Sequence, residues 1–126
     1  MHPAITHLSD APVSETPNAV MRTCASPSVG GSELAVWRTE MAPGASGPLH
    51  VADIEQVVVV LAGRLRTLVG GTEHVLEAGD AAVVPATVER QLSNPHAEPV
   101  TTLTAARPGS LATVGQGAPV GIPWAR

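Results

Sequence analysis

Turn-forming residues recur at short intervals along the whole chain, and their spacing limits which regular elements can form. Among 126 residues there are 12 Gly and 12 Pro. Proline lacks a backbone donor and has a fixed φ, so few uninterrupted stretches reach the length of a typical helix. The segments between the turns are short runs rich in Val, Leu and Ala, as expected of strands. The spacing therefore predicts an all-β protein.

The strand-like runs follow one another from residue 33 to residue 106 with only turns between them. The expected strands are Glu33–Met41, Gln56–Leu61, Arg64–Val69, Thr72–Leu76, Ala81–Val84, Val88–Leu92 and Val100–Ala106. Two of them flank Gly70-Gly71, which is a hairpin signature. Short strands at this spacing predict antiparallel sheets that form a sandwich or a barrel.

The length of the chain favours a single domain with two extensions. We assign residues 20–107 to one barrel, residues 1–19 to a polar N-terminal arm, and residues 108–126 to a Gly- and Pro-rich C-terminal tail. The prolines of the arm are expected to exclude regular structure there. The tail is expected to run over the surface, with Ile122–Trp124 pinning it to the barrel or to a second subunit.

The composition argues against nucleic-acid and membrane partners. The net charge is −4 and no Lys is present, so we expect no basic surface that could bind a phosphate backbone. Trp37 and Trp124 are the only aromatic residues, so we expect no platform on which nucleic-acid bases could stack. The longest apolar run, Val57–Ala62, is too short to span a bilayer, and no secretory signal is visible. With Cys24 as the only thiol, no internal disulfide is possible, and we expect a cytoplasmic protein.

The run Val57–Val60 has no polar alternation. A strand of this kind is expected to be buried on both faces. In a single small sandwich one sheet face meets solvent, so a second subunit is needed to cover the outer side of this strand. The run therefore predicts a homodimer.

Two segments carry glycines and polar residues at fixed spacings. In order along the chain, the first holds Gly44, His50, Gln56 and Gly63. The second holds Gly79, Pro85, Arg90 and Asn94. In both segments the chain resembles the cupin superfamily, whose two motifs have these spacings without a gap. The resemblance implies a small jelly-roll β-barrel with a pocket between its sheets, in agreement with the all-β prediction.

The chain departs from the cupin pattern where the family's metal ligands stand. In cupins with metal, three His and one Glu converge in the pocket. By position this chain offers His50, Ala52, Gln56 and Arg90. Alanine has no donor atom, and arginine is a permanent cation that repels a metal ion. We therefore expect a degenerate site without a cofactor; the disfavoured alternative is a divalent metal bound first by His50 and Gln56, with Asp53 or Glu55 as substitutes.

Residues two apart on a strand share a face, so the motif residues can be placed inside or outside the barrel. The resemblance implies that His50, Gln56 and Arg90 face the pocket, and parity allows each of them to do so. The apolar lining expected by the same argument is Val58, Val60, Val88 and Leu92. The sequence thus predicts an apolar pocket with a few polar groups at one end, which is typical of a small-molecule site.

The three polar residues have both catalytic and structural interpretations. His50 is a candidate proton shuttle near neutral pH, or a hydrogen-bonded relic of a former metal site. Arg90 and Gln56 are candidates for holding an anionic or carbonyl oxygen that gains charge. Alternatively, Arg90 forms a salt bridge with Glu89, Glu55 or Asp53, and Gln56 holds only water or backbone.

These features favour a small-molecule enzyme that uses the pocket for acid–base chemistry without a metal. The expected reaction type is that of a cyclase, isomerase, dehydratase or lyase acting on a carbonyl- or carboxylate-containing substrate. Similarity to other small cupins implies a place in natural-product biosynthesis. The alternatives are a non-catalytic small-molecule-binding or sensory cupin, and a structural relic stabilised as a dimer.

Overall fold

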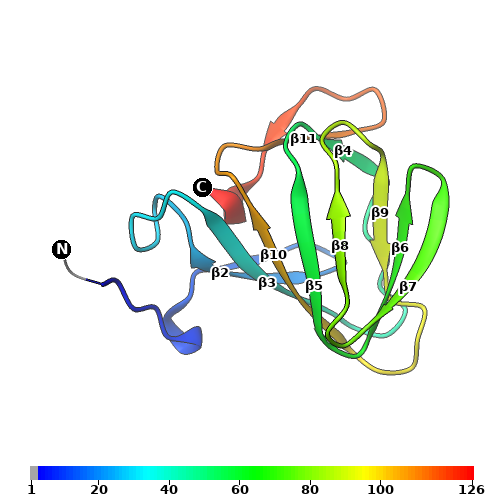
Figure 1. Ribbon diagram of the computed structural model, residues 1–126, viewed down its shortest axis with the longest axis horizontal. Helices are drawn as coiled ribbons and strands as arrows, with labels where there is room; N and C mark the ends of the chain where they lie inside the picture. Colours follow the sequence, from blue (N-terminus) through cyan, green and yellow to red (C-terminus); the bar gives the residue numbers. More distant parts are fainter. Residues whose placement is uncertain (1–2) are drawn as a thin grey trace.

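Two antiparallel sheets form the body of the protein, and the predicted all-β jelly-roll barrel is confirmed (Figure 1). The computed structural model describes residues 3–126, so Met1 and His2 of the predicted arm lie outside the described residues. Each sheet has six strands. The strand orders are β1-β2-β3-β10-β5-β8 and β12-β11-β4-β9-β6-β7.

The strands are short, and from β3 onward the chain passes repeatedly from one sheet to the other. The first sheet contains β1 (Val13–Glu15), β2 (Val20–Ala25), β3 (Ala35–Met41), β5 (Gln56–Ala62), β8 (Ala81–Val84) and β10 (Val100–Ala106). The second contains β4 (His50–Ala52), β6 (Arg64–Val69), β7 (Thr72–Glu77), β9 (Arg90–Ser93), β11 (Leu111–Val114) and β12 (Val120–Gly121). Two short 3-10 helices, η1 (Leu8–Asp10) and η2 (Pro123–Ala125), lie near the ends of the chain. All of the expected strands are present, although β9 begins at Arg90 rather than at Val88.

The sheets extend beyond residues 20–107 at both ends of the chain. Within the predicted arm, β1 pairs with β2, and its flanking prolines delimit the strand rather than prevent it. Within the predicted tail, β11 pairs with both β4 and β12. Ile122 and Ala125 are buried in a cluster with Met21, Ala35 and Trp37, so the end of the tail is pinned to the barrel of the same chain.

Burial along β5 alternates, although its sequence does not. Val58 and Val60 are buried on the inner face, whereas Val57 and Val59 are half-buried on the outer face. Neighbours β8 and β10 flank β5 within the sheet, but nothing in the described chain covers its outer side fully. Within a single chain, β5 is therefore fully buried on its inner face only, and not on both faces as expected.

One end of the barrel is filled by aliphatic side chains, and we call it the packed end. Its cluster contains Met41, Val58, Val60, Leu65 and Val100. Gly63 turns the chain from β5 into β6 with a φ of 77°. A Cβ at this position would meet the Pro99 carbonyl oxygen at 2.2 Å, so only glycine fits.

Asn94, at the end of the second motif, has a structural role. Its amide nitrogen donates to the carbonyl oxygens of Met41 and Glu98 at 3.2 and 2.8 Å, and its side-chain oxygen accepts the His96 N–H at 3.1 Å. These bonds satisfy a fully buried amide and tie the β9–β10 connection to β3. Within residues 3–126, no helix has the length and apolar character needed to cross a membrane.

Candidate functional site

A cavity of about 780 Å³ opens between the two sheets. His50, Gln56 and Arg90 all line it, so the structure brings the three predicted site residues together. The rest of the wall is mainly apolar and includes residues 16–19, 117–118 and 120–124 from the two ends of the chain. We call the part of the barrel around His50, Gln56 and Arg90 the cavity end.

His50 and Arg90 are direct neighbours on adjacent strands. They face each other in the register of β4 and β9, so their side chains leave the same side of the sheet. His50 Nδ1 lies 2.9 Å from the Pro48 carbonyl oxygen, which makes Nδ1 the protonated nitrogen and leaves the lone pair on Nε2. Burial lowers the pKa of His50, the bond to Pro48 partly opposes this, and the Arg90 charge lowers it further. The imidazole is therefore neutral near pH 7.

Arg90 is the largest fully buried side chain of the protein, with 1% of its surface exposed. Its Nε donates to the Val88 carbonyl at 3.1 Å, and its Nη2 donates to the carbonyls of Pro85 and Val88 at 2.8 and 2.9 Å. These bonds anchor the guanidinium to the turn that precedes β9. The remaining nitrogen, Nη1, makes one long contact of 3.5 Å with Oε1 of Gln56.

No carboxylate in residues 3–126 forms an ion pair with Arg90, so the alternative interpretation, a salt bridge to Glu89, Glu55 or Asp53, is wrong. Asp53 instead accepts hydrogen bonds from the Leu111 N–H and the Ser110 hydroxyl. Burial lowers the pKa of Arg90. A buried cation is costly unless an anion compensates it, so this guanidinium gives the cavity end a strong preference for negative charge.

Gln56 reaches the same point from the opposite sheet. It begins β5, where its register partners are Val84 on β8 and Ala106 on β10. Its side chain is buried, and Oε1 is turned toward Arg90. The polar side chains of Gln56, Arg90 and His50 thus come from both sheets and meet at one end of the cavity.

The predicted apolar lining is correct for Val58 and Leu92 and wrong for Val60 and Val88. Val60 points inward as expected, but it lies further along β5 and belongs to the packed end. Val88 precedes β9, in a turn where Thr87 has a φ of 66°. That turn interrupts the alternation on which the prediction for Val88 depended.

Sequence reasoning missed the contribution of the two tryptophans and of both chain ends to the wall. Trp37 and Trp124 line the cavity, together with Met21 and Val114. The available signal was compositional, because these are the only two aromatic residues in the chain. Their position in the fold could not be deduced from local patterns.

The residues at the cavity end do not fit the metal that the cupin pattern holds there. Ala52 is fully buried and offers no ligand, while Arg90 brings a positive charge to the place of a ligand. Asp53, weighed above as a substitute ligand, is engaged by Ser110 and Leu111. Across the described chain, no three His, Cys, Asp or Glu side chains are grouped so that they could hold a metal ion.

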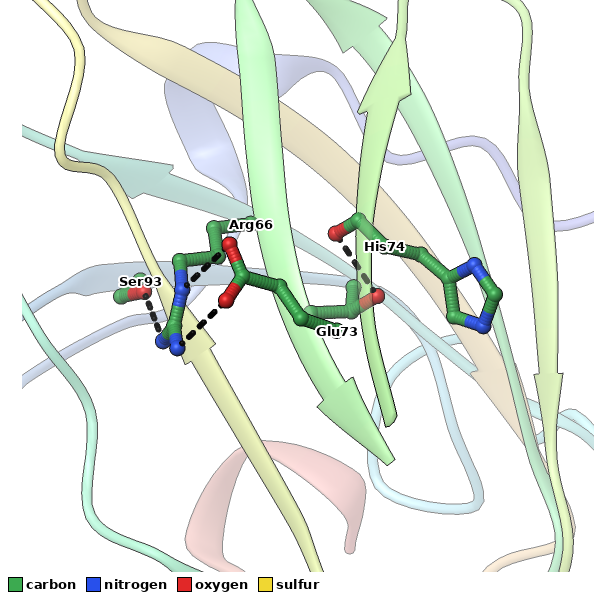
Figure 2. A network of polar contacts seen from close by, with 5 residues as sticks. Arg66, Glu73, His74 and Ser93 are labelled. Carbon is green, nitrogen blue, oxygen red and sulfur yellow. Dashed lines mark hydrogen bonds and ion pairs between the residues drawn. The ribbon is translucent and has the colours of Figure 1, made fainter. Parts of the chain in front are cut away.

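A second polar network lies on β6, β7 and β9, and none of its residues lines the cavity (Figure 2). Arg66 binds both carboxylate oxygens of Glu73 at 3.1 Å and contacts the Ser93 hydroxyl at 3.4 Å. The hydrogen bond and charge of Arg66 lower the pKa of Glu73. Because Glu73 is exposed to solvent, this pair has the character of a surface ion pair.

Comparison with known structures shows the same fold at low sequence identity. Oxalate decarboxylase from Lactobacillus farciminis, in a formate complex, matches with a TM-score of 0.72 and 19% identity over 80% of this chain, which spans 32% of that enzyme. A cupin-superfamily sugar phosphate isomerase from Silicibacter pomeroyi matches with 0.71 and 22%, covering 91% of this chain and 83% of the isomerase. The polyketide cyclase RemF from Streptomyces resistomycificus matches with 0.71 and 20%, covering 83% and 81%.

Sequence comparison identifies the family. No curated protein sequence gives a significant match. The family model described as a cupin domain matches residues 37–106, which include both motif segments and all three polar cavity residues. This protein belongs to the cupin family.

Proposed function

We propose that this cupin is an enzyme that performs acid–base chemistry on a small molecule with a carbonyl or carboxylate group, without a metal ion. The observation that carries the proposal is the buried Arg90 guanidinium, which has no carboxylate partner in the described chain and lies beside a neutral histidine. The two groups lie together in the wall of a mainly apolar cavity.

Arg90 is suited to hold the oxygen of the substrate that carries negative charge. Its Nε and Nη2 are fixed by backbone carbonyls, so Nη1 is the corner with donor capacity left for a ligand. A donor held rigidly in a dry site stabilises charge that develops during a reaction more strongly than a mobile one. Gln56, in contact with this corner, supplies a second polar group.

His50 is suited to move the proton. In its neutral form, Nε2 takes a proton from the carbon next to the substrate carbonyl, and the electron pair of that C–H bond moves onto the carbonyl oxygen to give an enolate. Arg90 and Gln56 stabilise the enolate oxygen. The imidazolium then returns the proton to another carbon, which gives isomerisation, or to a leaving group as its bond to carbon breaks, which gives elimination. In ring closure the enolate carbon attacks a second carbonyl carbon of the same molecule, the electron pair of that C=O bond moves to its oxygen, and the imidazolium protonates this oxygen.

The resemblance of the fold to a sugar phosphate isomerase and a polyketide cyclase is compatible with such reactions. The setting we propose is natural-product biosynthesis in the cytoplasm, where the single thiol, Cys24, stays reduced.

Proton abstraction is tested by incubating the metal-chelated protein with 2-oxo and 3-oxo carboxylates in deuterium oxide. Loss of the α-proton signal is followed by NMR. We expect exchange with the wild type and with the exposed-histidine control His74→Gln, and none above background with His50→Gln. Ligand binding without exchange would refute catalysis and support the alternative, a binding or sensory cupin.

Metal independence is tested on protein purified without added metal. We expect elemental analysis to find much less than one transition metal per chain, because alanine and arginine stand at two ligand positions. About one metal per chain, lost in His50→Ala, would overturn this part of the proposal.

We also propose that the protein is a homodimer that buries the outer face of the first sheet. Val57, Val59 and Leu103 are half-buried there, and Val83, the register partner of Val57, is 61% exposed. Light scattering at micromolar concentration should give twice the chain mass for the wild type and the chain mass for Val83→Glu. A monomeric wild type would contradict the proposal.

A further inference from the structure

Both aromatic side chains of the protein line the cavity. The sequence contains two Trp, no Tyr and no Phe. Trp37 comes from β3 in the first sheet, and Trp124 comes from η2 near the end of the chain. A chain that builds the rest of its core from aliphatic and small residues thus has both of its flat, rigid side chains at one place.

Separate parts of the fold bring the two tryptophans to the same cluster. Trp37 is 4% exposed and lies between Thr23 and Thr104 in the sheet register. The Thr23 hydroxyl donates to the Trp124 carbonyl at 2.9 Å, which ties η2 to β2. Trp124 packs against the buried cluster that contains Trp37, and η2 lies next to β2 and β3 (Figure 1).

Small side chains separate the indoles from the polar groups. In the first sheet, β10 lies between β5, which carries Gln56, and β3, which carries Trp37. Two strand spacings of about 4.8 Å place these strands roughly 10 Å apart. The inner residue of β10 that lines the cavity between them is Thr104, and Ala112 lines it from the second sheet. The hollow therefore extends from Arg90 toward the two indoles.

We propose that the ligand of this cavity is a flat, conjugated ring system with a carboxylate or enolate oxygen on one edge. The charged oxygen of this ligand rests on the proposed function, in which Arg90 binds that oxygen. The flat ring system is a separate inference, drawn from the two tryptophans in the cavity wall. Flat rings pack on indoles in offset-stacked or edge-to-face arrangements and gain attraction beyond the burial of apolar area. A flexible aliphatic chain of the same size gains no such attraction. The rigid walls also cost little entropy on binding, because an indole has two side-chain torsions.

The inference is tested by calorimetric titration of the full chain with 2-naphthoate and with decanoate, which have the same charge and nearly the same number of heavy atoms. We expect the wild type to bind naphthoate about tenfold more tightly. Tryptophan emission should change on binding, since both indoles lie in the cavity wall. Equal affinities for the two acids, or no naphthoate binding at millimolar concentration, would overturn the inference.

Three variants separate the ring contact from the anion contact. In Trp124→Leu, the preference for naphthoate over decanoate should fall toward unity, while decanoate affinity changes little. Leu92→Ala, an aliphatic wall residue, should alter both affinities alike and keep the preference. Arg90→Gln should weaken both acids. If Trp124→Leu does not fold, Trp37→Met provides the same comparison; an unchanged preference in the folded variant contradicts the inference.

Failure of this inference is distinguishable from failure of the proposed function. The preference between the two acids is read from binding alone, whereas acid–base catalysis is read from proton exchange. A protein that prefers naphthoate but exchanges no protons is an aromatic-ligand binder. A protein that exchanges protons without any preference for flat acids has the proposed chemistry but a different substrate class.

Discussion

The two ends of the barrel are built from the same strands but are filled in opposite ways. At the packed end, Val60, Leu65 and Val100 are all 0% exposed and belong to one aliphatic cluster. At the cavity end, the same β5 and β10 present Gln56 and Thr104 beside a hollow of about 780 Å³. The packed end supplies hydrophobic stabilisation, whereas the cavity end holds a buried cation and open space that oppose it.

The turns at the two ends also differ, in the steric cost of their backbone conformation. At the packed end, the left-handed backbone is at Gly63, where it costs little. At the cavity end, Thr87 takes a φ of 66° in the turn that leads to Arg90, although its side chain is β-branched. Unfavourable backbone of this kind collects near functional sites. In this comparison the unfavourable backbone lies in the turn before Arg90, at the end that holds the candidate site.

The largest expected effect is on the packed end. Leu65→Ala should lower the free energy of unfolding by about 2–5 kcal/mol, because it leaves a void among buried neighbours. Leu92→Ala, at the cavity wall, should cost roughly 1 kcal/mol, because it enlarges a space that already exists. Urea unfolding of both variants checks the difference, and equal losses would show that the two ends do not differ in packing.

The next largest effect is on ligand binding at the cavity end. Arg90→Ala should weaken the binding of 2-naphthoate by on the order of 2–4 kcal/mol, because the carboxylate would enter a dry site without its partner. Arg90→Lys should recover only part of this, since an ammonium lacks the planar fork. Calorimetry gives the affinities and a melting curve shows that the variant is folded. The exposed Arg64→Ala serves as the control, and unchanged affinity in Arg90→Ala would refute the anion site.

A smaller gain is expected from relieving the turn. Thr87→Gly should stabilise the fold by roughly 0.5–1 kcal/mol, because glycine adopts a positive φ without steric strain. Thr87→Ala removes the hydroxyl but keeps the unfavourable φ, so it should give no comparable gain. Thermal melting distinguishes the two. Destabilisation by Thr87→Gly would mean that the side chain, and not the backbone, determines the energy of this turn.

The smallest effect is the pH dependence contributed by His50. Its pKa is lowered in the folded chain, first by burial, so below its ordinary value of 6.5 the unfolded chain binds a proton that the folded chain binds less readily. Stability therefore falls as the pH falls through that value. His50→Gln should lose less stability than the wild type between about pH 7 and pH 5 in urea unfolding. Parallel curves for the two proteins would show that His50 is not held neutral by the fold; His74→Gln is the control.

Much of the fold follows from local chemistry in the sequence. Glycines with a left-handed backbone, such as Gly44, Gly63 and Gly79, mark turns that other residues form only with strain. Between the turns, runs such as Val100–Ala106 have few options other than a strand. The resemblance of the two motifs to those of cupins also predicted that His50, Gln56 and Arg90 would line one cavity. Side-chain alternation, a local property, only sorts the residues of each strand into two faces.

The tertiary structure decided what these residues meet. The short strands β1, β11 and β12 lie near the chain ends, where Gly, Pro and polar residues gave no strand signal. They exist because longer strands or each other offer them partners. Within the described chain Arg90 has no ion-pair partner, because the turns place the carboxylates of Asp53, Glu55 and Glu89 away from its guanidinium. The convergence of Trp37 and Trp124 likewise depends on a chain end folding back, since contacts between distant segments leave no trace in local composition.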